Sequence, residues 1–108
     1  MQQETLSVDI YCKKELKDSI VDMLLEDGYD DFFYIQCEKY ASSSFLKSTI
    51  EQVSGRQEYG LFRMFLSDQQ GARSVINKLF QAFGTDNVRI YTHSVFSPLE
   101  FTTNAKET

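Results

Sequence analysis

The stretch Ser42–Gln57, SSSFLKSTIEQVSGRQ, separates two strand-like runs, DFFYIQCEKY at residues 31–40 and RQEYGLFRMFL at residues 56–66. It is too long for a hairpin turn, and loops of this length inside a compact domain are usually functional or disordered. We therefore expect the loop to carry a site, and we expect residues 40–54 to be the most mobile internal segment. The two runs that flank it predict the second and third strands of a sheet.

The first part of the chain predicts a strand followed by a helix. Apolar and polar residues alternate over residues 5–12, which indicates a strand with one apolar face. The apolar spacing then changes to that of an amphipathic helix over residues 14–27. Gly28 follows the last turn of this helix and suits a left-handed cap.

The last part of the chain repeats this pairing in the order helix then strand. An amphipathic helix is predicted over residues 72–83 and ends at Gly84, and residues 87–96 predict a fourth strand. The order βαββαβ is the ferredoxin-like plan, an α+β sandwich with a four-stranded, antiparallel-type sheet and both helices on one face. We expect the first and third strands to lie side by side and parallel at the centre of the sheet.

Length and charge limit the class of protein. The chain has 108 residues and a net charge of −5, which predicts a single domain over residues 1–108 with a polar tail from about residue 102. Acidic residues are scattered and no basic block exists, so we expect no nucleic-acid partner. No apolar run reaches membrane-spanning length and no signal peptide is visible, so we predict a cytoplasmic protein without membrane insertion and with free thiols.

One face of the predicted sheet has an unusual composition. We assign the purely apolar sets of the first and third strands to the helix side, namely Val8 and Ile10 with Phe62, Met64 and Leu66. The side chains that point away from the helices combine aromatic rings with arginine, a composition typical of interfaces rather than of solvent-facing surfaces. An error of one residue in the strand assignments would instead make this face ordinary. The residues that we assign to an oligomer interface are Tyr11, Phe32, Tyr34, Arg63, Phe65 and Tyr91, and the wider face adds Asp9, Leu61 and Arg89.

The end of the long loop predicts an anion site. A flexible backbone N–H at Gly55 beside the guanidinium of Arg56 suits a phosphate or a carboxylate. In the alternative, Gly55 is only a turn and Arg56 pairs with Glu51 or Glu58. The candidate ligand-binding residues are Lys47, Gly55, Arg56 and Gln57.

A metal site is a second candidate. The expected strand directions bring His93, Cys37 and Glu38 to the same end of the sheet, where they offer donors for a divalent metal. The same directions place Cys12 at the opposite end, so we expect no disulfide between Cys12 and Cys37. A lone histidine near a strand end is more often a surface or interface residue. No arrangement of residues indicates catalysis.

Several of these segments resemble a known family. The run IEQVSGRQEYGLFRMFL at residues 50–66, the two glycine-capped helices and the closing run YTHSVFSPLEF at residues 91–101 are similar to the small PII-like proteins grouped as domain of unknown function 3240. The most specific part is the run EQVxGR at residues 51–56.

The resemblance implies a ferredoxin-like homotrimer whose sheet faces turn inward, with a dimer as the alternative. It also implies a small effector bound in clefts between subunits and a mobile loop at residues 40–55. Members of the family are often encoded beside heavy-metal efflux pumps. The signal-transducing PII proteins carry Gly-Arg-Gln near the start of this loop, whereas residues 55–57 lie at its end. Their nucleotide contacts are therefore not transferred to this chain.

Together these features predict a non-enzymatic regulatory module. Its effector is expected to be a divalent metal or an anion such as a nucleotide. The alternative is an interaction protein without a small ligand, whose loop docks on a partner such as a metal-efflux transporter.

Overall fold

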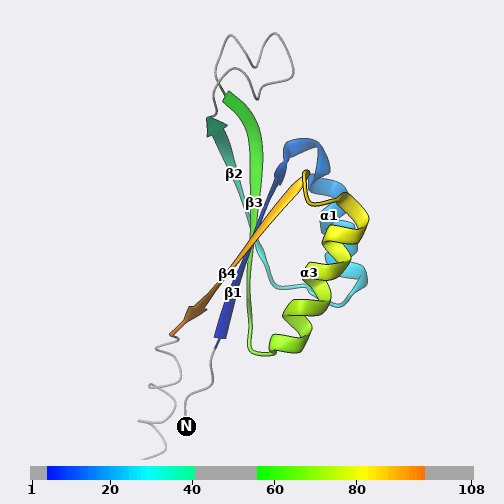
Figure 1. Ribbon diagram of the computed structural model, residues 1–108, viewed down its shortest axis with the longest axis vertical. Helices are drawn as coiled ribbons and strands as arrows, with labels where there is room; N and C mark the ends of the chain where they lie inside the picture. Colours follow the sequence, from blue (N-terminus) through cyan, green and yellow to red (C-terminus); the bar gives the residue numbers. More distant parts are fainter. Residues whose placement is uncertain (1–4, 41–55, 97–108) are drawn as a thin grey trace, which may run out of the picture.

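The computed structural model describes residues 5–40 and 56–96 and confirms the ferredoxin-like plan (Figure 1). Within these residues four strands form one sheet in the order β2-β3-β1-β4, and the helices α1 and α3 cover one of its faces. None of the helices in the described ranges is long and apolar enough to cross a membrane. The elements are β1 (Thr5–Lys13), the 3-10 turn η1 (Lys14–Leu16), α1 (Lys17–Glu26), β2 (Phe33–Tyr40), β3 (Arg56–Leu66), α3 (Gln69–Phe83) and β4 (Val88–Val95).

The directions of the central strands differ from the prediction. β1 and β3 are antiparallel neighbours, and β2 and β4 are also antiparallel to the strands beside them. The reason is geometric. The crossover through α1 makes β2 parallel to β1, but β3 lies between them and runs back along β2. The predicted parallel pair at the centre of the sheet is therefore wrong, and this error carries over to the predicted metal site.

The helix ends follow their local sequence. α3 begins before the predicted residue 72 because the Asp68 carboxylate accepts a hydrogen bond from the backbone N–H of Gln70 at 3.0 Å, which satisfies a donor of the first turn. After the helices, Gly28 and Gly84 have φ angles of +88° and +82°. Residues with a Cβ rarely adopt such angles. The prediction that each helix is followed by a glycine with a positive φ is therefore confirmed.

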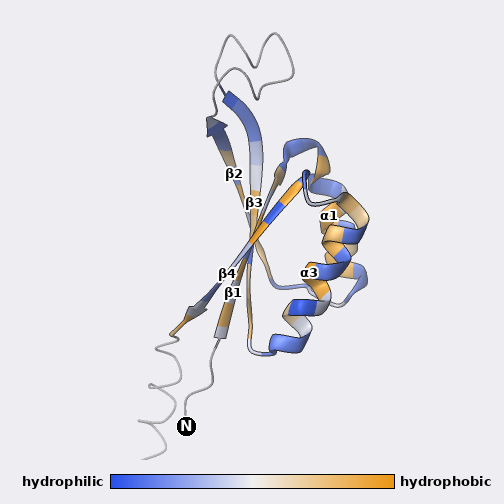
Figure 2. Ribbon diagram, viewed as in Figure 1, coloured by the Kyte–Doolittle hydropathy of each residue, from blue (hydrophilic) through white to orange (hydrophobic). Residues whose placement is uncertain are grey.

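The core lies between the sheet and the two helices. Figure 2 shows the hydrophobic stripes of α1 and α3 beside the sheet. The apolar sets predicted for the helix side of β1 and β3 are confirmed, since Val8, Ile10, Phe62 and Met64 are at most 1% exposed. The helices and β4 add the buried side chains of Ile20, Leu24, Ala72, Val75, Leu79 and Val88.

The assignment of β2 to its two faces was wrong by one residue. Tyr34 lies opposite Phe62 in the β2–β3 ladder, and its ring packs on the Phe62 ring with centroids 4.8 Å apart. Phe32 also contacts Phe62. Both predicted interface residues therefore belong to the helix side, and the open face of β2 presents Phe33 and Ile35 instead.

Candidate functional site

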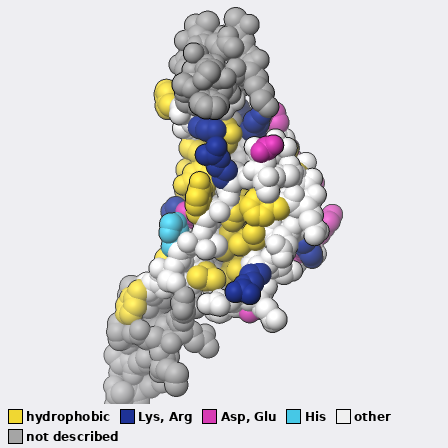
Figure 3. Space-filling view, viewed as in Figure 1, with side chains coloured by type: hydrophobic (Ala, Val, Ile, Leu, Met, Phe, Trp, Pro, Cys, Tyr) yellow, Lys and Arg dark blue, Asp and Glu magenta, His cyan; other side chains and the backbone are white. Residues whose placement is uncertain are grey.

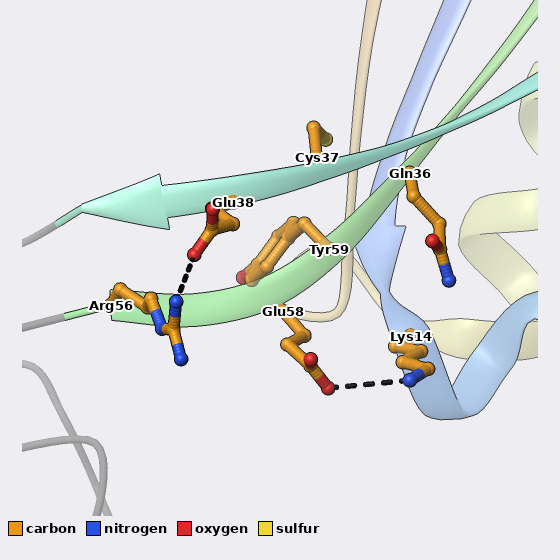
Figure 4. A pocket seen from close by; sticks show the side chains of 7 residues that line it. All are labelled: Lys14, Gln36, Cys37, Glu38, Arg56, Glu58 and Tyr59. Atoms are coloured by element: carbon orange, nitrogen blue, oxygen red, sulfur yellow. Dashed lines mark hydrogen bonds and ion pairs between the residues drawn. The ribbon is translucent and has the colours of Figure 1, made fainter. Parts of the chain in front are cut away.

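A polar pocket of about 420 Å³ lies where β2 and β3 extend toward residues 41–55 (Figure 4). Lys14 reaches it from the 3-10 turn that follows β1. The two long strands supply the rest of the lining. The lining residues are Lys14, Gln36, Cys37, Glu38, Arg56, Glu58 and Tyr59.

Two ion pairs organise this pocket. Arg56 Nη1 donates to Glu38 Oε2 at 2.8 Å, and Lys14 Nζ donates to Glu58 Oε2 at 3.4 Å (Figure 4). Glu38 and Glu58 lie directly opposite each other in the β2–β3 ladder, where two like charges repel. The two cations offset that repulsion. All four side chains are between 44% and 64% exposed, so each pair is weak and a ligand anion can replace a glutamate.

The structure brings only part of the predicted anion site to this pocket. Arg56 lines it and pairs with Glu38 rather than with Glu58. Gln57 is 8% exposed and does not line the pocket. Lys47, Glu51 and Gly55 lie outside the described residues. The segment that we predicted to be mobile, residues 40–54, also lies outside them except for Tyr40.

Sequence reasoning missed Lys14, Gln36 and Tyr59. The missing information was the direction of β1 relative to β3. In the antiparallel ladder Lys13 lies opposite Tyr59, so the residue after β1 arrives beside the β2–β3 pair. With the predicted parallel pairing, Lys14 would lie at the far end of the sheet. An antiparallel pairing of β1 and β3 in the prediction would have identified Lys14 as a residue of this pocket.

The predicted metal donors are separated within one chain. Cys37 lies opposite Tyr59 near one end of the sheet, whereas His93 lies opposite Ser7 near the other end. The prediction that His93 approaches Cys37 and Glu38 is therefore wrong, because it depended on the wrong strand direction. In residues 5–40 and 56–96, no three His, Cys, Asp or Glu side chains form a group that could hold a metal ion.

The two cysteines lie near the same end of the sheet rather than at opposite ends. Cys12 and Gln36 both lie opposite Gly60, on either side of β3, so Cys37, the next residue after Gln36, points to the other face. Both thiols are free, as expected. The two side chains are separated because they point to opposite faces of the sheet, and not because they lie at opposite ends. Burial, together with the nearby Cys37, raises the pKa of Cys12 to about 11, and burial also raises the pKa of Cys37.

An ion pair between a buried carboxylate and a partly exposed arginine lies on the open face. Asp9 is 3% exposed, and both of its carboxylate oxygens accept hydrogen bonds from Arg63, at 2.9 and 3.0 Å. Ser7 donates a further bond, and His93 Nε2 lies 3.8 Å from Asp9 Oδ2. The hydrogen bonds from Arg63 outweigh the effect of burial and hold the pKa of Asp9 below its usual range.

Around this pair the open face exposes large apolar side chains. Phe33 is 59% exposed, Phe65 50% and Tyr91 51%, and Ile35 is 46% exposed. Figure 3 shows hydrophobic side chains along the strand side of the molecule, interrupted by basic ones. The ladders also place the predicted residues Tyr11, Arg63, Phe65 and Tyr91 on this face. Their role in an oligomer stays a prediction.

Comparison with known proteins places the chain among related folds. The model of the family described as "Protein of unknown function (DUF3240)" matches residues 2–98. No curated protein matches the chain significantly. Among solved structures, a DUF3240 family protein from Shewanella baltica is 19% identical with a TM-score of 0.63, and the match covers 90% of this chain and 94% of that one.

Two further solved structures share the fold. The B. subtilis GlnK–ATP complex is 11% identical with a TM-score of 0.62, and the match covers 88% of this chain and 84% of that one. CPII, a nitrogen regulatory PII-like protein from Thiomonas intermedia bound to ADP, AMP and bicarbonate, is 14% identical with a TM-score of 0.54, covering 88% of this chain and 96% of that one. At these identities the likeness establishes the fold.

Proposed function

This chain belongs to the DUF3240 family of proteins of unknown function, and from that premise we propose that it is a non-enzymatic regulatory protein that binds a small anionic effector. A nucleotide is our first candidate. The observation that carries the proposal is the pocket in which Lys14 and Arg56 converge from different elements. Support comes from the fold shared with a GlnK solved with ATP and with a PII-like protein solved with ADP and AMP.

The two cations suit an anion because each is bound only weakly by its glutamate. Arg56 offers a planar fork that matches phosphate or carboxylate oxygens, and Lys14 adds a mobile point charge. Tyr59, on the same strand as Arg56, also lines the pocket. An anion that takes Arg56 from Glu38 gains a charge-assisted hydrogen bond, and the cross-strand glutamates lose part of their neutralisation.

The position of Arg56 suggests how binding would be transmitted. Arg56 lies opposite Tyr40 at the last rung of the β2–β3 ladder. These two residues flank residues 41–55 in the sequence. A change of partner at Arg56 therefore acts at the base of that segment. We propose that the effector signals through residues 40–55 in this way.

The same proposal includes self-association through the open face. Four large, partly exposed side chains around the part-buried Asp9–Arg63 pair have the composition of an interface centre. A homotrimer is our first choice and a dimer the alternative. The separated donors of Cys37 and His93 do not favour a metal as the effector, and we do not extend the proposal to a metal-efflux transporter.

Calorimetry with ATP, ADP and AMP tests the effector. We expect Lys14→Gln and Arg56→Gln to weaken nucleotide binding about tenfold each, as loss of a charge-assisted hydrogen bond would do. Arg73→Gln removes the same charge from the exposed surface of α3 and should leave binding unchanged. Equal affinity in all four proteins would contradict the proposal. No heat from any nucleotide would instead favour the interaction protein without a small ligand.

A further inference from the structure

His93 projects from the open face of the sheet beside the Asp9–Arg63 ion pair. Its Nε2 atom lies 3.8 Å from Asp9 Oδ2, and its side chain is 60% exposed, whereas that of Asp9 is 4% exposed. We propose that His93 makes self-association through the open face sensitive to pH, so that mild acid separates the subunits. Such a switch rests on the self-association proposed above, and it uses none of the residues that line the effector pocket.

The charge of Asp9 is already balanced by another residue. Arg63 donates hydrogen bonds to both carboxylate oxygens, at 2.9 and 3.0 Å, and Ser7 donates a further one at 3.3 Å. The hydrogen bonds from Arg63 hold the pKa of Asp9 below its usual range, so the carboxylate stays ionised in mild acid. The protonation of His93 therefore decides the charge of the cluster, which is neutral with the neutral imidazole and positive with the protonated one.

The surroundings of His93 offer it no second carboxylate within residues 5–40 and 56–96. On β1 it lies opposite Ser7, and β2 brings the apolar Phe33 opposite Arg63. The charged and titratable groups on this face that lie near His93 are Asp9 and Tyr11 on β1, Arg63 on β3, and Tyr91 and Arg89 on β4. Both arginines are cations, so a protonated His93 adds to a positive charge that this face already carries.

Covering the open face with a second copy would remove water from His93. Phe65 is 50% exposed and Tyr91 is 51% exposed on the same face. A protonated imidazole loses more hydration in such a contact than a neutral one does, and Asp9 is already bound to Arg63. In a closed assembly of identical chains each subunit brings its own His93 to the interface, so this cost is repeated in every subunit.

The direction of the pH effect depends on which state binds more protons. Separated subunits expose His93 to water, where it can take up a proton, whereas the assembly favours the neutral imidazole. Lowering the pH therefore favours the separated subunits. Imidazoles in water change charge between about pH 8 and pH 5, above the range in which carboxylates do. An association that excludes one such proton weakens by up to about tenfold for each pH unit below about 6.5.

Sedimentation velocity of the full chain at about pH 7.5 and about pH 5.5, at constant ionic strength, tests the switch. We expect the dissociation constant of the subunits to be at least about tenfold larger at the lower pH. His93 is the only histidine of the chain, so His93→Gln removes the imidazole altogether and should assemble with the same affinity at both pH values. Circular dichroism at each pH checks that the subunits stay folded.

A permanent charge tests the same point without a change of pH. His93→Lys should weaken assembly of the full chain at about pH 7.5 at least as much as acid weakens that of the wild type. Thr92→Lys is the matched control, because it adds the same charge at the preceding residue of β4, which lies opposite Val8 and belongs to the helix side. This control should assemble like the wild type. Both positions are exposed, so neither replacement removes a core contact.

Several outcomes would overturn the switch. They are equal association of the wild type at the two pH values, tighter association at the lower pH, a pH dependence that His93→Gln retains, and equal weakening by Thr92→Lys and His93→Lys. Each of these results leaves self-association itself standing. Single subunits at every pH and concentration would instead contradict the proposed self-association, and the switch with it.

Discussion

Gly60 lets the ring of Tyr34 lie flat against β3, and the substitution Gly60→Ala tests this contact. A Cβ at position 60 would come within 2.6 Å of Tyr34 Cζ, and the Tyr34 hydroxyl would be nearer still. Non-bonded carbon atoms need about 3.5 Å. The ring cannot move away freely, because Phe62 packs against it and Lys17 Nζ lies 4.6 Å from its centroid.

The sign of the change in unfolding free energy shows which of two effects of Gly60→Ala is larger. One is the usual stabilisation when alanine replaces a strand glycine, and the other is the steric clash with Tyr34. Gly60 has an ordinary negative φ, and replacing such a glycine in a strand normally stabilises by about 0.5–1 kcal/mol. Forcing an extra methyl group into a packed site costs about 1–3 kcal/mol. We therefore expect net destabilisation, with a fall in Tm of about 4–8 °C for each kcal/mol in a domain of this size.

Urea unfolding of a double-mutant cycle measures the contact. Tyr34→Leu removes the ring, so Gly60→Ala should cost much less in that background, with a coupling energy of about 1 kcal/mol or more. Tyr34→Phe is the matched control. Within the described residues the Tyr34 hydroxyl is buried without a hydrogen-bond partner, so its removal alone should not destabilise. Stabilisation by Gly60→Ala, or additive effects in the cycle, would refute the reasoning.

Three further predictions follow from the open face and the thiols. Because its folded-state pKa is lowered, Asp9 should stabilise the fold fully above its unfolded-state pKa of about 3.9 and lose that contribution as the pH falls through the folded value. The unfolding free energies of wild type and Asp9→Asn should therefore converge as the pH falls below about 3.9, and a constant difference would contradict this. Cys12, with a pKa of about 11 and no exposed surface, should react with iodoacetamide more slowly than Cys37, and mass spectrometry that finds Cys12 modified first would exclude it. Ile35→Asp should lower the mass of any assembly in light scattering, because it places a charge in an apolar contact, whereas Leu25→Asp, at an equally exposed position on α1, should not.

Periodicity in the sequence was sufficient where the two faces of an element differ in polarity. In β1 and over residues 62–66 of β3 the helix-side residues are uniformly apolar and their neighbours are mixed, so Val8 and Phe62 were correctly placed in the core. β2 lacks this contrast, because its run FFYI is apolar on both faces. A shift of one residue changes neither the strand prediction nor its apparent hydrophobicity. The interface residues of β2 were therefore assigned to the wrong face.

The candidate site was harder to predict because its members are distant in the chain. Lys14 and Glu58 are 44 residues apart, and Asp9 and Arg63 are 54 residues apart. Their contacts depend on the direction and register of the β1–β3 ladder. The adjacent residue types Gly55 and Arg56 indicated an anion site from local sequence alone. The identity of the partner of Arg56 required the register of β2 against β3.

Over the described residues, the sequence alone determined the order of the elements, the glycines that end the helices and the apolar sets of β1 and β3. These properties depend on interactions within a few residues, where backbone geometry imposes a period of 2 or about 3.6. Only the tertiary structure decided which way β3 runs beside β1, which face of β2 is buried and which charges meet. The physical reason is that strand pairing brings residues together through ladder hydrogen bonds that any sequence can form, so local composition does not specify them.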